Sequence, residues 1–407
     1  MIGQVKHSPW VRRPPLWLAA AAVASGWGAA YSIGVWIVLF VLGPVHQDVR
    51  FTYVAAEAGL RYGWSTIYDP ATLRSLSASF PLGEQDIGSH ATYINPPLLA
   101  WLFAPLTAVP EPVAYGLWTA LSLGALVWAW HLAAPHTGLA KITLLLLALA
   151  LWPVLLTFYY GQPSIVLFLL VALAWWLTAH ERPLAAGAAL ALATFLKPQA
   201  IALIPLALMA SGRYRPVVGW VLSCVALGLA SIVTLGPSGL MGWWHALQDV
   251  QADPAHTSNT LARLFGLGPL TYALWALQGM AALLIAWWRK RELELVFAAG
   301  ILGSVVVAFH FHEWDYTILV LAAWLVLRTS PPTWHRLWLV AGVVPMQLMT
   351  FGPAAAGLDL IAPQLVWNAA WLAILAAGCH PGNTGRAIAI IPLMRRRRDQ
   401  AMSPLHQ

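Results

Sequence analysis

Long apolar runs separated by short polar connectors make up most of the chain. The runs cover about residues 17–43, 112–133, 139–158, 163–179, 184–197, 198–210, 215–236, 269–288, 293–309, 315–328, 335–351 and 362–378. A helix needs about 20 mostly apolar residues to cross a bilayer. The pattern therefore predicts an all-α polytopic membrane protein with about twelve transmembrane helices.

The longest polar segment, roughly 44–93, follows the first of these runs. Within it, residues 51–63 show helical periodicity, and we expect them to form a helix along the membrane surface. A further apolar run, 96–109, begins with Asn95-Pro96-Pro97 and is too short for a full span. It predicts a re-entrant or interfacial helix, so that 44–111 forms one continuous segment on one side of the membrane.

The distribution of cations indicates which side that is. If 96–109 does not cross and residues 1–16 are cytoplasmic, all but five of the 22 lysines and arginines lie inside. The five outside are Arg50, Arg61, Arg74, Lys197 and Arg263. Lysine and arginine concentrate in cytoplasmic loops. We therefore expect both termini to be cytoplasmic, the first run to be a retained anchor, and the longer loops to be extracytoplasmic.

The composition agrees with this architecture and excludes several classes. Hydrophobic residues make up 60% of the chain and charged residues only 9%, whereas a soluble domain carries about 25% charged residues. The 2 cysteines define neither a disulfide framework nor a metal site. The net charge of +7 sits mostly in short loops and in the basic tail 380–407, so it does not indicate nucleic-acid binding. No second domain is evident, and 1–407 is expected to be one unit.

Candidate chemistry gathers at the outer ends of the predicted spans. Asp48 opens the long polar segment, and ionisable groups beside hydrocarbon are often functional. Lys197-Pro198 breaks a long apolar stretch and places an ammonium at the outer end of a helix. A carboxylate base and a cation are what transfer from a lipid-phosphate sugar donor requires, because a hydroxyl loses its proton and a phosphate departs.

Each candidate also has a structural interpretation. Asp48 fits an N-cap of the following helix, and Lys197 fits a side chain that reaches from hydrocarbon to the interface. Gln162 fits a turn cap, and His312 fits an ordinary interfacial histidine. The run His310–Asp315 has metal-ligating residue types, but a spacing of two points His310 and His312 to different helix faces. No metal is expected.

Together these motifs resemble the polyprenol-phosphate-sugar-dependent integral membrane glycosyltransferases of the C-fold superfamily, in particular glycosyltransferase family 87. That family includes the α-mannosyltransferase of the phosphatidylinositol mannoside pathway. The resemblance runs in order across about residues 17–330. It rests on Asp48, Tyr68-Asp69, Tyr93–Pro97 with Pro105, Gly161–Ser164, Leu196–Pro198, Ser258-Asn259 and His312–Asp315. Ser164 replaces the usual asparagine, and Gln47 precedes Asp48 where many C-fold enzymes have a second acid.

The resemblance implies an inverting single displacement on the extracytoplasmic face of the cell (plasma) membrane. The expected donor is a polyprenyl-monophosphate sugar, with mannose as the sugar, and the acceptor is a lipid or envelope-glycan hydroxyl. No cofactor, nucleotide or metal is expected. Asp48 would be the base, supported by His312. We predict donor-phosphate binding by Lys197, Arg50 and Arg263, and substrate contacts by Gln162, Asn95, Asn259, Tyr68 and Asp315.

Two other functions are compatible with a polytopic chain. A transporter or flippase of lipid-linked glycans would show internal repeats and ionisable residues at mid-membrane. A non-catalytic subunit of a membrane assembly would have no need of Asp48, Lys197 and His312 together. The charges lie at the ends of spans and no repeat is visible, so the sequence favours a glycosyltransferase.

Overall fold

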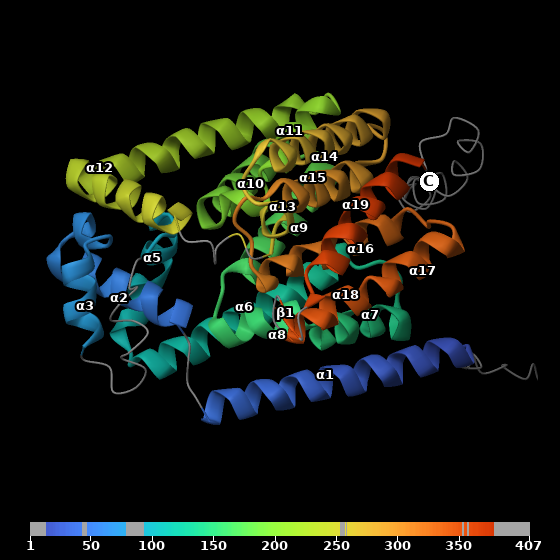
Figure 1. The fold of residues 1–407 in the computed structure, drawn as a ribbon, viewed down its shortest axis with the longest axis horizontal. Helices are drawn as coiled ribbons and strands as arrows, with labels where there is room; N and C mark the ends of the chain where they lie inside the picture. The colour runs from blue at the N-terminus through green and yellow to red at the C-terminus, as the bar shows by residue number, and fades with distance from the viewer. Residues whose placement is uncertain are drawn as a thin grey trace, which may run out of the picture.

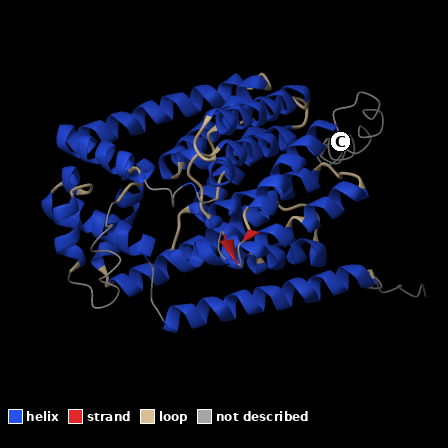
Figure 2. Ribbon diagram, viewed as in Figure 1, coloured by secondary structure: helices blue, strands red, loops and turns tan. Residues whose placement is uncertain are grey.

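The computed structural model describes residues 14–42, 47–78, 93–252, 257, 259–351, 354–355 and 358–377. The described residues are helical apart from loops and one two-stranded antiparallel pair, β1 (Ala354–Ala355) and β2 (Leu358–Asp359). Figure 2 shows the helices filling the molecule. The predicted all-α class is confirmed. Residues 1–13, 79–92 and the basic tail 380–407 lie outside the described residues.

The first half of the chain alternates long helices with short ones. Its elements are α1 (Leu16–Leu42), α2 (Gln47–Tyr62), η1 (Trp64–Thr66), α3 (Pro70–Ser77), α5 (Pro97–Phe103), η2 (Ala104–Ala108), α6 (Glu111–Ala133), α7 (Gly138–Ala150), α8 (Trp152–Tyr160), α9 (Ser164–Ala179), α10 (Pro183–Leu196) and η3 (Pro198–Ala200).

The second half opens with the longest helix. Its elements are α11 (Leu203–Ala210), α12 (Tyr214–Ala252), α13 (Leu261–Phe265), α14 (Pro269–Trp288), α15 (Leu293–Val307), η5 (Glu313–Thr317), α16 (Ile318–Arg328), α17 (Thr333–Ala341), α18 (Val343–Leu348), η6 (Met349–Phe351) and α19 (Ala362–Ala377).

The helices coincide with the predicted apolar runs, but fewer of them are long enough to span a membrane. Among the described residues, four are long and apolar enough: Leu16–Val41, Glu111–Ala133, Tyr214–Asp249 and Pro269–Trp288. The pair α7 and α8, bent by 62°, would make a fifth. The remaining apolar helices, such as α9, α10 and α15, are shorter. The prediction of about twelve spans is therefore not confirmed.

Two long helices form opposite edges of the molecule, as Figure 1 shows. α1 runs along one edge and α12 along the other, and both are largely exposed. Between them lies a core built around α15, whose side chains are buried from Leu295 to Val306. The start of α1 and the end of α19 lie at the same end of the molecule, and α2, α3 and α5 lie at the other.

The segment predicted to run along the surface packs mainly against protein. α2 covers 51–63 nearly as expected, but Val49, Ala55 and Ala58 are fully buried. The helix packs against α5, η1 and η2. The short run after Asn95 becomes α5 followed by a 3-10 turn, with Leu99 and Phe103 buried. Its re-entry into a membrane stays a prediction.

A kink in α12 brings its second half over this end of the molecule. Gly236 has φ 61° and ψ −176°, a conformation that favours glycine, and Pro237 follows it. Beyond the kink, the ring of Trp243 stacks on Tyr68 at 5.9 Å, and its Nε1 donates to the Ile94 carbonyl at 3.1 Å. The contact fixes the residues leading into α5.

Candidate active site

Asp48 is the second residue of α2, and its carboxylate points away from the helix toward the core. Its Oδ2 accepts a hydrogen bond from Gln162 Nε2 at 2.6 Å. The side chain is partly exposed, while the next residue, Val49, is fully buried. Asp48 therefore stands between solvent and interior, joined to a residue far away in sequence.

The turn between α8 and α9 fixes the position of Gln162. Gly161 ends α8 with φ 70°, and a Cβ there would lie 2.0 Å from Val49 Cγ2, so only glycine fits. The Gln162 N–H donates to the Thr157 carbonyl at 2.9 Å, and Trp118 Nε1 donates to the Gly161 carbonyl at 2.8 Å. The amide of Gln162 is thus presented to α2 by a rigid turn.

Lys197 approaches the same amide from the end of α10. Pro198 cannot continue the helix, so Lys197 ends it, and its side chain is only 7% exposed. Its Nζ donates to Gln162 Oε1 at 3.1 Å and forms an ion pair with Asp315. The ammonium also lies 5.9 Å from the ring centroid of Trp314, within the range of a cation–π contact.

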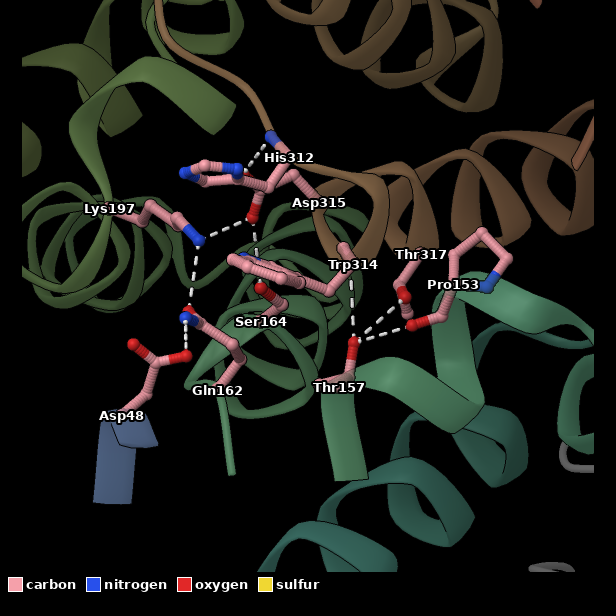
Figure 3. Close-up of polar contacts among 10 residues, drawn as sticks. All are labelled: Asp48, Pro153, Thr157, Gln162, Ser164, Lys197, His312, Trp314, Asp315 and Thr317. Atoms are coloured by element: carbon pink, nitrogen blue, oxygen red, sulfur yellow. Dashed lines mark hydrogen bonds and ion pairs between the residues drawn. The ribbon is translucent and has the colours of Figure 1, made fainter. Parts of the chain in front are cut away.

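Asp315 is held from three directions. It lies in η5, is 2% exposed, and pairs with Lys197 through Oδ1. The Ser164 hydroxyl donates to the same oxygen at 3.1 Å, and the His312 backbone N–H donates to Oδ2 at 3.1 Å. Figure 3 shows the resulting chain Asp48–Gln162–Lys197–Asp315, which we call the polar relay.

The protein surrounding its carboxyl group raises the pKa of Asp48. Loss of hydration raises its pKa to about 6, while the Gln162 hydrogen bond and the Lys197 charge act in the opposite direction. A carboxyl with a pKa near 6 is a stronger base than an ordinary aspartate, yet it is ionised at neutral pH. These are the properties that a general base requires.

Comparison with known proteins identifies the family of the protein that contains this relay. A model of glycosyltransferase family 87 matches residues 93–311. The chain belongs to glycosyltransferase family 87. No curated protein and no solved structure matched it. The matched range contains Gln162 and Lys197, whereas Asp48 and Asp315 lie outside it and join the relay through contacts in the fold.

Two histidines of this glycosyltransferase, His310 and His312, lie beside Trp314 and the relay. The His312 ring stacks on Trp314 at 4.5 Å, and the His310 ring meets His312 edge-on at 4.8 Å. No group of three His, Cys, Asp or Glu side chains among the described residues is placed to hold a metal ion. Support of the base by His312 stays a prediction.

The other two predicted phosphate-binding residues pair with acids elsewhere. Arg50 Nη2 lies 3.7 Å from Glu111 at the start of α6, and both side chains are buried. Arg263 Nε donates to Asp359 Oδ2 at 3.1 Å, in a partly exposed pair that joins α13 to β2. The relay thus contains Lys197 but neither arginine.

Of the remaining predicted substrate contacts, Tyr68 and Asn259 are buried and Asn95 is half-buried. The Tyr68 hydroxyl donates to the Asn95 carbonyl at 2.8 Å, and the Tyr316 hydroxyl donates to the Asn259 carbonyl at 2.8 Å. Tyr68 is 3% exposed and Asn259 is 2% exposed. These contacts stabilise the loops before α5 and α13, and a substrate role for the three residues stays a prediction.

Three further residues contact the relay or support it, although they were not predicted as site residues: Ser164, Trp314 and Thr157. Ser164 binds Asp315 from the position where the family usually has asparagine. The Thr157 hydroxyl contacts the Trp314 carbonyl at 3.3 Å and Thr317 Oγ1 at 3.2 Å, and so joins α8 to η5 (Figure 3). The sequence feature that could have indicated them is their closeness to Gln162 or Asp315 along the chain.

Proposed function

We propose that this glycosyltransferase transfers a hexose, mannose, from a polyprenyl-monophosphate donor to a hydroxyl of a lipid or envelope glycan, with inversion. The acceptor oxygen attacks C1 of the sugar while the C1–O bond to phosphate breaks. Asp48 removes the hydroxyl proton, and Lys197 stabilises the phosphate that leaves. A phosphate departs as an anion, so a cation serves it better than a general acid.

The observation that carries the proposal is the bridge made by Gln162. One amide accepts from Lys197 and donates to Asp48, which fixes the base and the cation a single side chain apart. This spacing suits a donor whose reacting carbon lies between its phosphate and the acceptor oxygen. Preorganised groups of this kind stabilise developing charge without having to move during the reaction.

The environment of Lys197 is compatible with a transient phosphate. Its charge is balanced by Asp315, which allows the ammonium to be buried before the donor arrives. An ammonium has three N–H donors, and within the described part of the chain Gln162 and Asp315 accept from it. One donor is then left for a phosphate oxygen.

The cation count supports placing this chemistry on the extracytoplasmic face of the plasma membrane, with both termini inside. The start of α1 and the end of α19 lie at the end of the molecule opposite α2 (Figure 1). A polyprenyl donor and a lipid acceptor would reach the relay from the bilayer. The proposed reaction uses no nucleotide and no metal.

The direct test is Asp48→Asn, assayed with radiolabelled polyprenyl-phosphate mannose and with other prenyl-phosphate sugars. Asparagine has nearly the same size and caps helices as well as aspartate does, but it cannot accept the proton. We expect turnover to fall about 10²–10⁴-fold, with donor binding retained.

Asp69→Asn is the matched control, because it makes the same change in the same segment. Asp69 caps α3 through the Ala71 and Thr72 N–H groups and lies outside the relay. Its asparagine variant should keep turnover within about twofold, since asparagine caps as well as aspartate. Retention of most turnover by Asp48→Asn would exclude Asp48 as the base. If the wild type preferred another prenyl-phosphate sugar, the identity of the sugar would change, and the proposed roles of Asp48 and Lys197 would stand.

A further inference from the structure

A second cationic feature lies where α10 and α12 begin, away from the polar relay. A hollow of about 600 Å³ there is lined by Arg182, Pro183, Leu184, Ala185 and Arg215. The two arginines come from different parts of the chain, Arg182 just before α10 and Arg215 in the first turn of α12. The fold therefore brings together two positive charges that are far apart in the sequence.

Glycine contacts between the two helices create this arrangement. A Cβ on Gly187 would lie 2.3 Å from the Pro216 carbonyl oxygen, and one on Gly219 would lie 2.6 Å from the Leu184 carbonyl oxygen. The backbones approach this closely only because neither position has a side chain. The contact lies about one turn inside each helix, so the helix starts and their arginines are held side by side.

The lining combines charge with apolar surface. Both arginine side chains are exposed, and neither makes an ion pair with any residue that the structure describes. The other lining residues, Pro183, Leu184 and Ala185, are apolar, and Leu184 is 58% exposed. The lining contains no acid, although exposed Glu181 is adjacent in sequence.

The hollow lies at the start of a helix that is long and apolar enough to cross a membrane. α12 is one of the helices long and apolar enough to cross a membrane, and Arg215 lies in its first turn. Tyr214 beside it is 64% exposed, and tyrosine is enriched at membrane–water interfaces. Basic hollows between membrane helices are suited to anionic headgroups.

We propose that this hollow binds the phosphate of an anionic phospholipid, with Arg182 and Arg215 on the phosphate oxygens and Leu184 against the first acyl methylenes. Guanidinium groups match phosphate geometry well, and the apolar wall favours a lipid over a free anion. The site is separate from the proposed donor site. Arg182 precedes α10 and Lys197 follows it, and a helix of 14 residues is about 21 Å long.

The test measures lipid binding directly and does not depend on turnover. The full chain is reconstituted in nanodiscs of phosphatidylcholine with a minor share of phosphatidylglycerol, and the lipids retained after extraction are counted by native mass spectrometry. The wild type should retain phosphatidylglycerol preferentially. Each arginine near the surface contributes about fivefold, so Arg182→Gln/Arg215→Gln should lose about 30-fold in affinity for that lipid.

Lys290→Gln/Arg291→Gln is the matched control, since it also removes two positive charges, from the turn between α14 and α15. The turn is near the start of α12, because Glu294, just after it, interacts electrostatically with Arg213, the residue before α12. The control charges therefore lie in the same region of the molecule as the hollow. The control should keep the wild-type lipid preference, and Arg182→Lys/Arg215→Lys should keep much of it. Melting curves in phosphatidylcholine alone would show that all variants are folded.

Three results would overturn the proposal. Equal retention of phosphatidylglycerol by Arg182→Gln/Arg215→Gln and the wild type would exclude the two arginines as its site. Equal loss in the Lys290→Gln/Arg291→Gln control would indicate only a general effect of charge. Displacement of the lipid by millimolar inorganic phosphate would indicate a site for free anions, because the acyl contact would then contribute nothing.

Discussion

Two buried ion pairs lie in the same half of the molecule, and their surroundings differ. Lys197 and Asp315 are embedded in a network, because Gln162, Ser164 and the His312 backbone N–H supply further hydrogen bonds. Arg50 and Glu111 lie 3.7 Å apart, and Glu111 Oε1 has no hydrogen-bond partner in the described structure. The first pair receives several further hydrogen bonds, whereas one carboxylate oxygen of Glu111 in the second pair receives none within the described residues.

The difference indicates what each pair does. A buried ion pair repays its lost hydration only when further hydrogen bonds satisfy both groups. The first pair meets this condition and connects through Gln162 to Asp48, so its geometry is fixed where chemistry is proposed. The second joins α2 to α6 and has no described link to Asp48. We infer a catalytic setting for the first and a packing role for the second.

Of changes to the two ion pairs, removal of Lys197 should have the largest effect. Lys197→Met takes away the cation proposed for the departing phosphate, and we expect turnover to fall about 10²–10³-fold. It also leaves Asp315 buried without its partner, which should cost about 3–5 kcal/mol of stability. Donor-dependent turnover and thermal melting in the same detergent measure the two effects.

The double variant Lys197→Met/Asp315→Asn separates activity from folding. Neutralising both partners should restore most of the lost stability without restoring turnover. If turnover returned with stability, Lys197 would serve folding alone, and the contrast with the Arg50 pair would disappear.

The pH dependence of turnover should show an intermediate effect. Asp48 must be ionised to act as a base, so turnover should fall as pH decreases through about 6. The Gln162 hydrogen bond lowers the pKa of Asp48, and Gln162→Leu should therefore move this limb to higher pH. Loss of one hydrogen bond of about 1 kcal/mol should reduce the ionised fraction of Asp48 at pH 6 from about a half to about a sixth. We therefore expect about a threefold loss of turnover from this cause at pH 6 and a much smaller one at pH 8.5.

The ionisation of Asp48 should affect stability in the opposite direction from turnover: it enables the base, but it destabilises the fold. The folded pKa of about 6 lies above the ordinary 3.8, so folding favours protonated Asp48, and that contribution is lost as pH rises through 6. Asp48→Asn should thus stabilise the protein by up to about 3 kcal/mol at pH 8 and by little at pH 4. Melting temperatures that change equally at both pH values would contradict a raised pKa.

The smallest effect on turnover is expected at the second pair. Arg50→Met/Glu111→Met replaces both charges with apolar groups, which is often neutral or stabilising for a buried pair. Turnover should stay within about twofold of wild type, whereas Arg50→Met alone should lower the melting temperature. A tenfold loss of turnover in the stable double variant would show that Arg50 reaches the donor.

The sequence predicted the helices well and the site in part. Apolar periodicity located nearly every helix, because burial in a core and burial in lipid require the same residues. The number of spans could not be predicted in this way, since a short apolar helix such as α15 can be buried entirely by protein. Length and hydropathy do not distinguish the two environments.

Within the site, the strongest individual signals were Asp48 and Lys197, and the fold joins them through Gln162. Arg50 was predicted to bind the donor phosphate as one of the few outer cations. Residues two apart on a helix point to different faces, and the fold directs Arg50 to Glu111. That partner lies at the start of another helix and has no local signal, so tertiary packing decided the outcome.

The relay also sets an order of events during synthesis. Lys197 is made well before Asp315, by about ten seconds at ordinary elongation rates. During that interval its ammonium has no Asp315 to neutralise it, and hydrocarbon is unfavourable for an unpaired cation. The end of α10 therefore has to stay near water until η5 arrives, so the site closes among the last contacts of the folding chain.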